Sequence, residues 1–134
     1  MSINEKITAF FPQHLNRPAY QYTIPTNGDR NNLNISLLVD LFRIQLDQTY
    51  NLLIEVFDDG NAIKTTNVPI QIKKEAVNDA TFILDGDTII ATNTISIKDV
   101  PLPKKDDFQL IIQLSLFKDN LLLDGPVKTY LNLH

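Results

Sequence analysis

Residues 108–117, with the sequence FQLIIQLSLF, alternate between apolar and polar side chains over much of their length. The even positions are all apolar: Phe108, Leu110, Ile112, Leu114 and Leu116. The odd positions include Gln109, Gln113 and Ser115. Because successive side chains of a β-strand point to opposite faces, this period of two predicts a long strand with one buried face. Residues 50–56, YNLLIEV, repeat the pattern and predict a second such strand.

Weaker alternation predicts further strands along the rest of the chain, over residues 7–11, 20–24, 35–44, 68–72, 80–84, 89–97 and 127–133. Three polar stretches between them contain residues that tolerate positive φ: Asp58-Asp59-Gly60-Asn61, Asp85-Gly86-Asp87 and Lys118-Asp119-Asn120. No long segment keeps the 3.6-residue period of an amphipathic helix. The pattern predicts an all-β protein of about seven to nine short strands, folded as an antiparallel two-sheet β-sandwich.

Two of these segments resemble a known architecture. Residues 50–63 (YNLLIEVFDDGNAI) and 107–114 (DFQLIIQL), the latter leading to Lys118-Asp119-Asn120, are similar to hairpins of immunoglobulin-like or C2-like sandwiches in uncharacterised bacterial proteins. The resemblance covers about half of the chain and carries no functional residues. It implies the two-sheet fold alone, because one fold hosts many functions.

Length and charge narrow the classes of protein. A chain of 134 residues fits one domain, spanning residues 1–134, with a core of its own. The formal net charge of -4 and the dispersed basic residues argue against a nucleic-acid partner. The absence of cysteine excludes disulfides and thiolate metal sites.

The chain also lacks signals for membranes. No apolar run approaches the roughly 18 residues that span a bilayer. The N-terminal residues lack the basic start and apolar stretch of a signal peptide. We therefore expect no membrane partner and a cytoplasmic location.

Motifs for catalysis are missing. The two histidines, His14 and His134, do not occur in a paired metal-binding spacing, and there is no Gly-x-Ser-x-Gly elbow. The four glycines are too far apart for a phosphate-binding loop. We expect no catalytic residues, no cofactor and no enzymatic activity. An enzyme would need a site assembled from Asp, Glu, Lys and Tyr that no motif reveals.

Aspartates gather at the predicted turns, and carboxylates from several loops can bind calcium in a C2-like sandwich. The candidate ligands are Asp58, Asp59, Asp85 and Asp87. The favoured explanation is local, since aspartate side chains bond to nearby backbone groups in turns. A calcium site requires that these loops meet at one end of the sandwich.

Aromatic residues cluster near the N-terminus, where sandwiches can present a platform for sugars. They are Phe10, Phe11, Tyr20 and Tyr22. Packing on a sheet face is the favoured role, since burial of aromatic side chains contributes strongly to a core. A ligand-binding sandwich, for calcium or for carbohydrate, is the alternative function.

The outer faces of the two clearest strands are less polar than solvent exposure would require. Alternation assigns Leu53, Phe57, Ile111 and Phe117 to that outer side. Either the proline-rich N-terminal third of the chain covers them, which is the favoured explanation, or another subunit does. We predict a non-enzymatic interaction module that binds a protein partner, or a second copy as a homo-oligomer, through this surface or exposed strand edges.

Overall fold

The computed structural model describes residues 5–24, 31–76, 83–85 and 87–134. Ten strands account for about three quarters of these residues. They are β1 (Lys6–His14), β2 (Arg17–Pro18), β3 (Gln21–Tyr22), β4 (Asn32–Gln45), β5 (Thr49–Asp58), β6 (Asn61–Gln71), β7 (Ile83–Asp85), β8 (Thr88–Pro101), β9 (Phe108–Lys118) and β10 (Leu121–Leu133). In the described ranges the only helix is a three-residue 3-10 turn, η1 (Lys74–Ala76), and no helix could cross a membrane.

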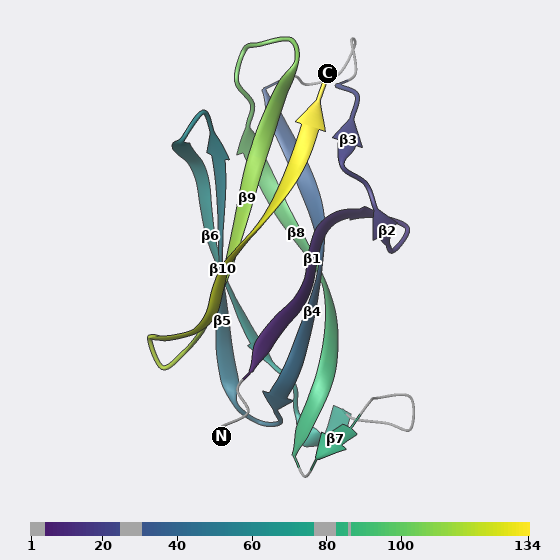
Figure 1. Ribbon diagram of the computed structural model, residues 1–134, viewed down its shortest axis with the longest axis vertical. Coiled ribbons are helices and arrows are strands. Elements are labelled where there is room, and N and C mark those ends of the chain that lie inside the picture. Colours follow the sequence, from purple (N-terminus) through teal and green to yellow (C-terminus); the bar gives the residue numbers. More distant parts are fainter. Residues whose placement is uncertain (1–4, 25–30, 77–82, 86) are drawn as a thin grey trace.

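The strands form two five-stranded sheets (Figure 1). The first has the order β2-β1-β4-β8-β7 and the second has the order β3-β10-β9-β5-β6. Neighbouring strands are antiparallel, except that β3 runs parallel to β10. This arrangement confirms the predicted all-β, two-sheet sandwich.

Alternation buries one face of each central strand. The inward residues of β5 and β9 are completely buried: Tyr50, Leu52, Ile54, Val56, Leu110, Ile112, Leu114 and Leu116. They meet in register, with Leu52 beside Leu116 and Ile54 beside Leu114. Leu37, Val39 and Leu41 of β4 supply the facing layer of the core. Burying an aliphatic side chain of this size contributes about 1.5 to 3 kcal/mol, so the alternating pattern determines which way each sheet faces.

The β5–β6 and β9–β10 hairpins, whose turns are predicted from the sequence, share one turn geometry, which the β1–β2 turn at Leu15 and Asn16 also has. In the β5–β6 turn, Asp59 and Gly60 have φ values of 48° and 81°, and in the β9–β10 turn, Asp119 and Asn120 have 52° and 63°. Two successive residues at positive φ match the right-handed twist of the paired strands. Both turns agree with the sequence prediction, because the residues involved tolerate this conformation. The predicted Asp85-Gly86-Asp87 turn joins β7 to β8, although Gly86 lies outside the described residues.

Several boundaries differ from the sequence prediction. The β6 strand starts at Asn61, well before residue 68, because an edge strand with one face exposed and the other only half-buried shows little hydrophobic alternation. Of residues 20–24 only Gln21–Tyr22 forms a strand, a short parallel pairing with the end of β10. The predicted strand 80–84 lies largely outside the described residues.

The two sheets are joined along one side by β1 and β10. The backbone N–H of Ile7 in β1 donates to Oδ2 of Asp124 in β10 over 2.8 Å. Farther along, the chain leaves β1 and crosses to the second sheet, where β3 pairs with β10. The backbone N–H of Ala19 donates to the Pro12 carbonyl, and that of Asn132 donates to the Tyr20 carbonyl. The crossing segment is therefore held on both sides.

Candidate functional site

The outer face of the second sheet carries an apolar row across three strands. Phe57 of β5 lies beside Ile111 of β9, and Ile111 lies beside Tyr130 of β10. Phe57 and Ile111 are half-buried, and Tyr130 is 44% exposed. Sequence reasoning missed Tyr130, although its position between the buried Thr129 and Leu131 marks it as outward-facing.

A second apolar group lies nearer the β9–β10 hairpin. Phe117 of β9 lies beside Leu122 of β10, which is 47% exposed. Leu53 and Phe117 line a shallow depression of about 200 Å³ together with Asn51, Asn67 and Asn120. The four predicted surface residues therefore share one sheet face: Leu53, Phe57, Ile111 and Phe117. We call these four residues, together with Tyr130 and Leu122, the outer apolar face.

A polar row separates the two apolar groups. Glu55 of β5 lies beside Gln113 of β9, and Gln113 lies beside Lys128 of β10. Glu55 and Lys128 are two strands apart, or about 10 Å at the usual strand spacing. Neither forms an ion pair with another residue in the described ranges. Both charges are therefore available to an outside partner.

No described strand lies over this face. All ten strands belong to one of the two sheets. The strands of the N-terminal third lie elsewhere: β1 and β2 are in the first sheet, and β3 is at the edge of the second. The described strands of the N-terminal third therefore do not lie over this outer face of the second sheet.

The calcium candidates are not brought together. Asp58 and Asp59 lie in the β5–β6 hairpin, whereas Asp85 and Asp87 lie at the β7–β8 turn (Figure 1). The Asp58–Asp59 pair contacts Lys105, just past the end of β8, and Asp87 directly precedes the start of β8. Strand β8 has 14 residues, so about 40 Å separates the two turns. Four ligands so far apart cannot share one ion.

Lys105 already forms ion pairs with both carboxylates of the first pair. Its Nζ lies 2.7 Å from Oδ2 of Asp59 and 2.9 Å from Oδ1 of Asp58. These two hydrogen bonds, that of Asp59 first, raise the pKa of the Lys105 ammonium. Among the residues that the structure describes, no three His, Asp or Glu side chains are grouped as a metal site would require.

The four clustered aromatics do not form one platform. Phe10 is buried in the core, in line with the favoured packing role. Phe11 pairs with Leu38 on the outer side of the first sheet, while Tyr20 and Tyr22 lie exposed on the crossing segment, so the favoured packing role is wrong for these two tyrosines. Although they are close in sequence, they lie on different surfaces, so a sugar platform made of all four is absent.

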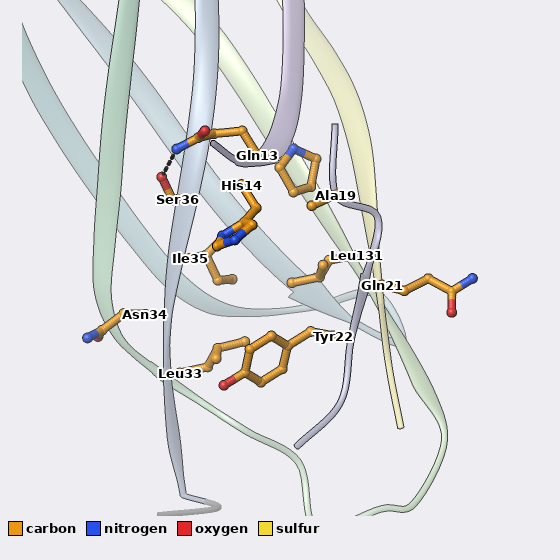
Figure 2. Close-up of a pocket in the computed structure, with 11 residues that line it drawn as sticks. Gln13, His14, Ala19, Gln21, Tyr22, Leu33, Asn34, Ile35, Ser36 and Leu131 are labelled. Carbon is orange, nitrogen blue, oxygen red and sulfur yellow. Dashed lines mark hydrogen bonds between the residues drawn. The ribbon is translucent and has the colours of Figure 1, made fainter. Parts of the chain in front are cut away.

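Tyr22 instead borders a cavity of about 510 Å³ in the seam between the sheets (Figure 2). Its apolar lining includes Leu33, Ile35 and Leu131. Figure 2 shows the rings of His14 and Tyr22 turned toward the space, while the amide of Gln21 points away. We call this space the seam cavity. Its size lies within the range of about 300 to 1,000 Å³ for small-molecule sites.

The polar groups at the seam cavity differ in whether they are free to bind a ligand. The Gln13 amide is occupied, since its Nε2 donates to Ser36 Oγ over 2.5 Å and its Oε1 accepts from the N–H of Asn16 over 2.7 Å. The His14 ring nitrogens and the Tyr22 hydroxyl have no hydrogen-bond partner in the described part of the chain. These groups could therefore contact a ligand. His134 lies apart, with its Nε2 beside Thr23 Oγ1.

One titratable side chain is buried in the core. Burial raises the pKa of the Tyr50 phenol, even though the hydrogen bond from the Gln45 N–H to its oxygen favours ionisation. A phenol kept neutral in this way stabilises the core. Tyr50 belongs to neither the seam cavity nor the outer apolar face.

Comparison with known proteins adds a fold-level relationship. No family model matches the chain, and no curated protein matches it. Among solved structures it is similar to a bacterial adhesin from Mobiluncus mulieris containing intramolecular disulfide, isopeptide and ester bond cross-links, in two crystal forms. The TM-scores are 0.62 and 0.61, over 98% and 95% of this chain. The fold resembles that of a bacterial adhesin.

The likeness is limited to the fold, because the sequence identities are only 9% and 11%. The chain spans 58% and 49% of the length of the two adhesin structures. It is consistent with the immunoglobulin-like, β-rich resemblance noted from the hairpin sequences. No residue of the seam cavity or of the outer apolar face acquires a role from it.

Proposed function

We propose that this chain is a non-enzymatic interaction domain that binds protein through its outer apolar face. The main evidence is the row of Phe57, Ile111 and Tyr130, which is aligned across three strands and has no described strand over it. Soluble monomers rarely leave large contiguous apolar patches in water, and such patches mark interaction sites. Aromatic residues are also enriched among the residues that contribute most to protein interfaces.

The adhesin likeness supports a binding role and carries no sign of catalysis. The cytoplasmic location expected from the N-terminal sequence remains a proposal.

Replacing Phe57 by aspartate tests whether the outer apolar face is a free surface. We expect the free energy of unfolding to fall by only about 1 to 2 kcal/mol, since Phe57 is half-buried and lies outside the buried core. Binding of an apolar fluorescent dye should fall, because the row is interrupted. Urea denaturation and dye titration of the dilute protein provide the two measurements.

The matched control is Val56→Asp, one residue away on the buried side of the same strand. It should prevent folding, because it places an unpaired charge in the core. If Phe57→Asp destabilises the domain by several kcal/mol as well, Phe57 serves the fold and the proposal is wrong.

The seam cavity supports a second candidate function, the binding of a small neutral ligand. Its apolar lining favours a mainly apolar molecule, and the unpaired groups of His14 and Tyr22 favour one that carries a hydroxyl group. A carbohydrate would need more hydrogen bonds than these groups offer, since the Gln13 amide is already occupied. We therefore propose a phenol as the ligand class.

Millimolar p-cresol is expected to raise the melting temperature, because a ligand that binds only the native state stabilises it. Ala19→Trp, which fills the seam cavity, should abolish this effect, whereas Ala62→Trp on the exposed β5–β6 hairpin should not. An effect of glucose without one of p-cresol would favour the carbohydrate alternative. No effect of either compound would exclude the seam cavity as a site of this kind.

A further inference from the structure

The outer apolar face has a lateral symmetry centred on β9. In the polar row, Glu55 and Lys128 lie one strand to either side of Gln113. In the apolar row, Phe57 and Tyr130 lie one strand to either side of Ile111. Opposite charges thus occupy mirrored positions about β9, and aromatic rings occupy mirrored positions in the neighbouring row.

A twofold axis that runs parallel to β9 would use this symmetry. Such an axis lies between two facing sheets, exchanges the β5 and β10 sides, and leaves the position along β9 unchanged. Glu55 of one copy would then face Lys128 of the other, twice in the dimer. Phe57 would face Tyr130, and Ile111 would face its own counterpart. Every contact of this kind is self-complementary, as a twofold interface requires.

The other twofold arrangement of these faces is unfavourable. An axis across the strands through the polar row would place Glu55 against Glu55 and Lys128 against Lys128. Like charges in contact oppose association, even though this axis would place one apolar group against the other. Charge complementarity therefore selects the axis parallel to β9. Facing sheets pack at about 30°, so the match is closest around Gln113 and Ile111.

We propose that the partner of the outer apolar face is a second copy of this chain, packed face to face about a twofold axis parallel to β9. This inference rests on the proposed function, that the face binds protein, and adds the identity and orientation of the partner. The paired charges of Glu55 and Lys128 determine the orientation. The Phe57, Ile111 and Tyr130 row contributes most of the buried apolar surface.

Two charge-reversed variants of the full chain test this geometry. In Glu55→Lys, each copy presents two lysines that face lysines of its partner, and in Lys128→Glu, glutamates face glutamates. Each variant alone should dimerise about tenfold more weakly than the unmodified chain, since two ion pairs become two repulsions. An equimolar mixture should recover the original affinity, because both lysines of the first variant then face glutamates of the second. Sedimentation equilibrium gives the dissociation constants.

Two further measurements serve as controls. Thr92→Lys adds a charge to the exposed surface of β8 in the first sheet and should leave the dissociation constant unchanged. Higher salt should reduce the difference between the single variants and the unmodified chain, because exposed charges are screened.

Each contrary result has a separate meaning. A chain that remains monomeric at high concentration, while Phe57→Asp still folds and loses dye binding, overturns this inference and leaves the proposed function standing. A dimer whose single variants are not rescued by mixing overturns the orientation about β9. A Phe57→Asp variant that fails to fold overturns the proposed function, and the inference with it.

Discussion

The substitution Gly125→Ala is expected to destabilise the domain by about 3 kcal/mol, because both the backbone conformation and the neighbouring strand oppose a side chain at this position. Its φ of 105° lies in a region that residues with a Cβ rarely adopt. A Cβ there would lie 2.7 Å from the Leu114 carbonyl oxygen and 3.1 Å from the Cα of Ser115. Both atoms belong to the β9 backbone, so relief requires movement of the β9–β10 ladder.

Gly60→Ala is the matched control for this substitution. Gly60 also has a positive φ, 81°, but a Cβ added there meets nothing within 4 Å. Its loss should be about 1 kcal/mol, the cost of the backbone conformation alone. Urea denaturation of both variants gives the comparison. Equal losses of stability in the two variants would show that the close approach of Gly125 to β9 adds no destabilisation beyond that of its backbone conformation.

Leu114→Ala is expected to lower the free energy of unfolding by about 2 to 5 kcal/mol. Leu114 is completely buried at the centre of β9 and pairs with Ile54 of β5, so truncation leaves a cavity that neighbouring strands cannot close. Leu121→Ala, at the start of β10, should cost less than about 0.5 kcal/mol, because Leu121 is 65% exposed. Thermal and urea unfolding measure both. Similar losses at the two leucines would contradict the assignment of inner and outer positions.

Part of the outer apolar face was predictable from the sequence. Leu53, Phe57, Ile111 and Phe117 follow from alternation, which acts within a single strand and needs no knowledge of its neighbours. Leu122 was missed because the alternation of β10 is interrupted by register shifts around Asp124, whereas Tyr130 lies past those shifts and its outward position was readable from the alternation of residues 127–133. Extra positions in a strand displace the pattern by which an outer residue is recognised.

The positions of the aspartate and aromatic clusters, by contrast, were not predictable from the sequence. Asp58 and Asp87 were grouped by composition, yet they lie at opposite ends of β8. Phe10 and Tyr22 are near in sequence, yet one enters the core and the other borders the seam cavity. Distance along the chain says little about distance in a sandwich, where most contacts join remote strands.

The sequence by itself determined the strand class, the inward faces of β5 and β9, and the β5–β6 and β9–β10 turns, because each depends on a few neighbouring residues and the faces they present to water. Only the tertiary structure decided that Glu55, Gln113 and Lys128 form one row, and that Phe57, Ile111 and Tyr130 form the next. Those rows depend on the register between three strands, which the pairing of the whole sheet sets. The seam cavity likewise exists only where the crossing segment joins the two sheets.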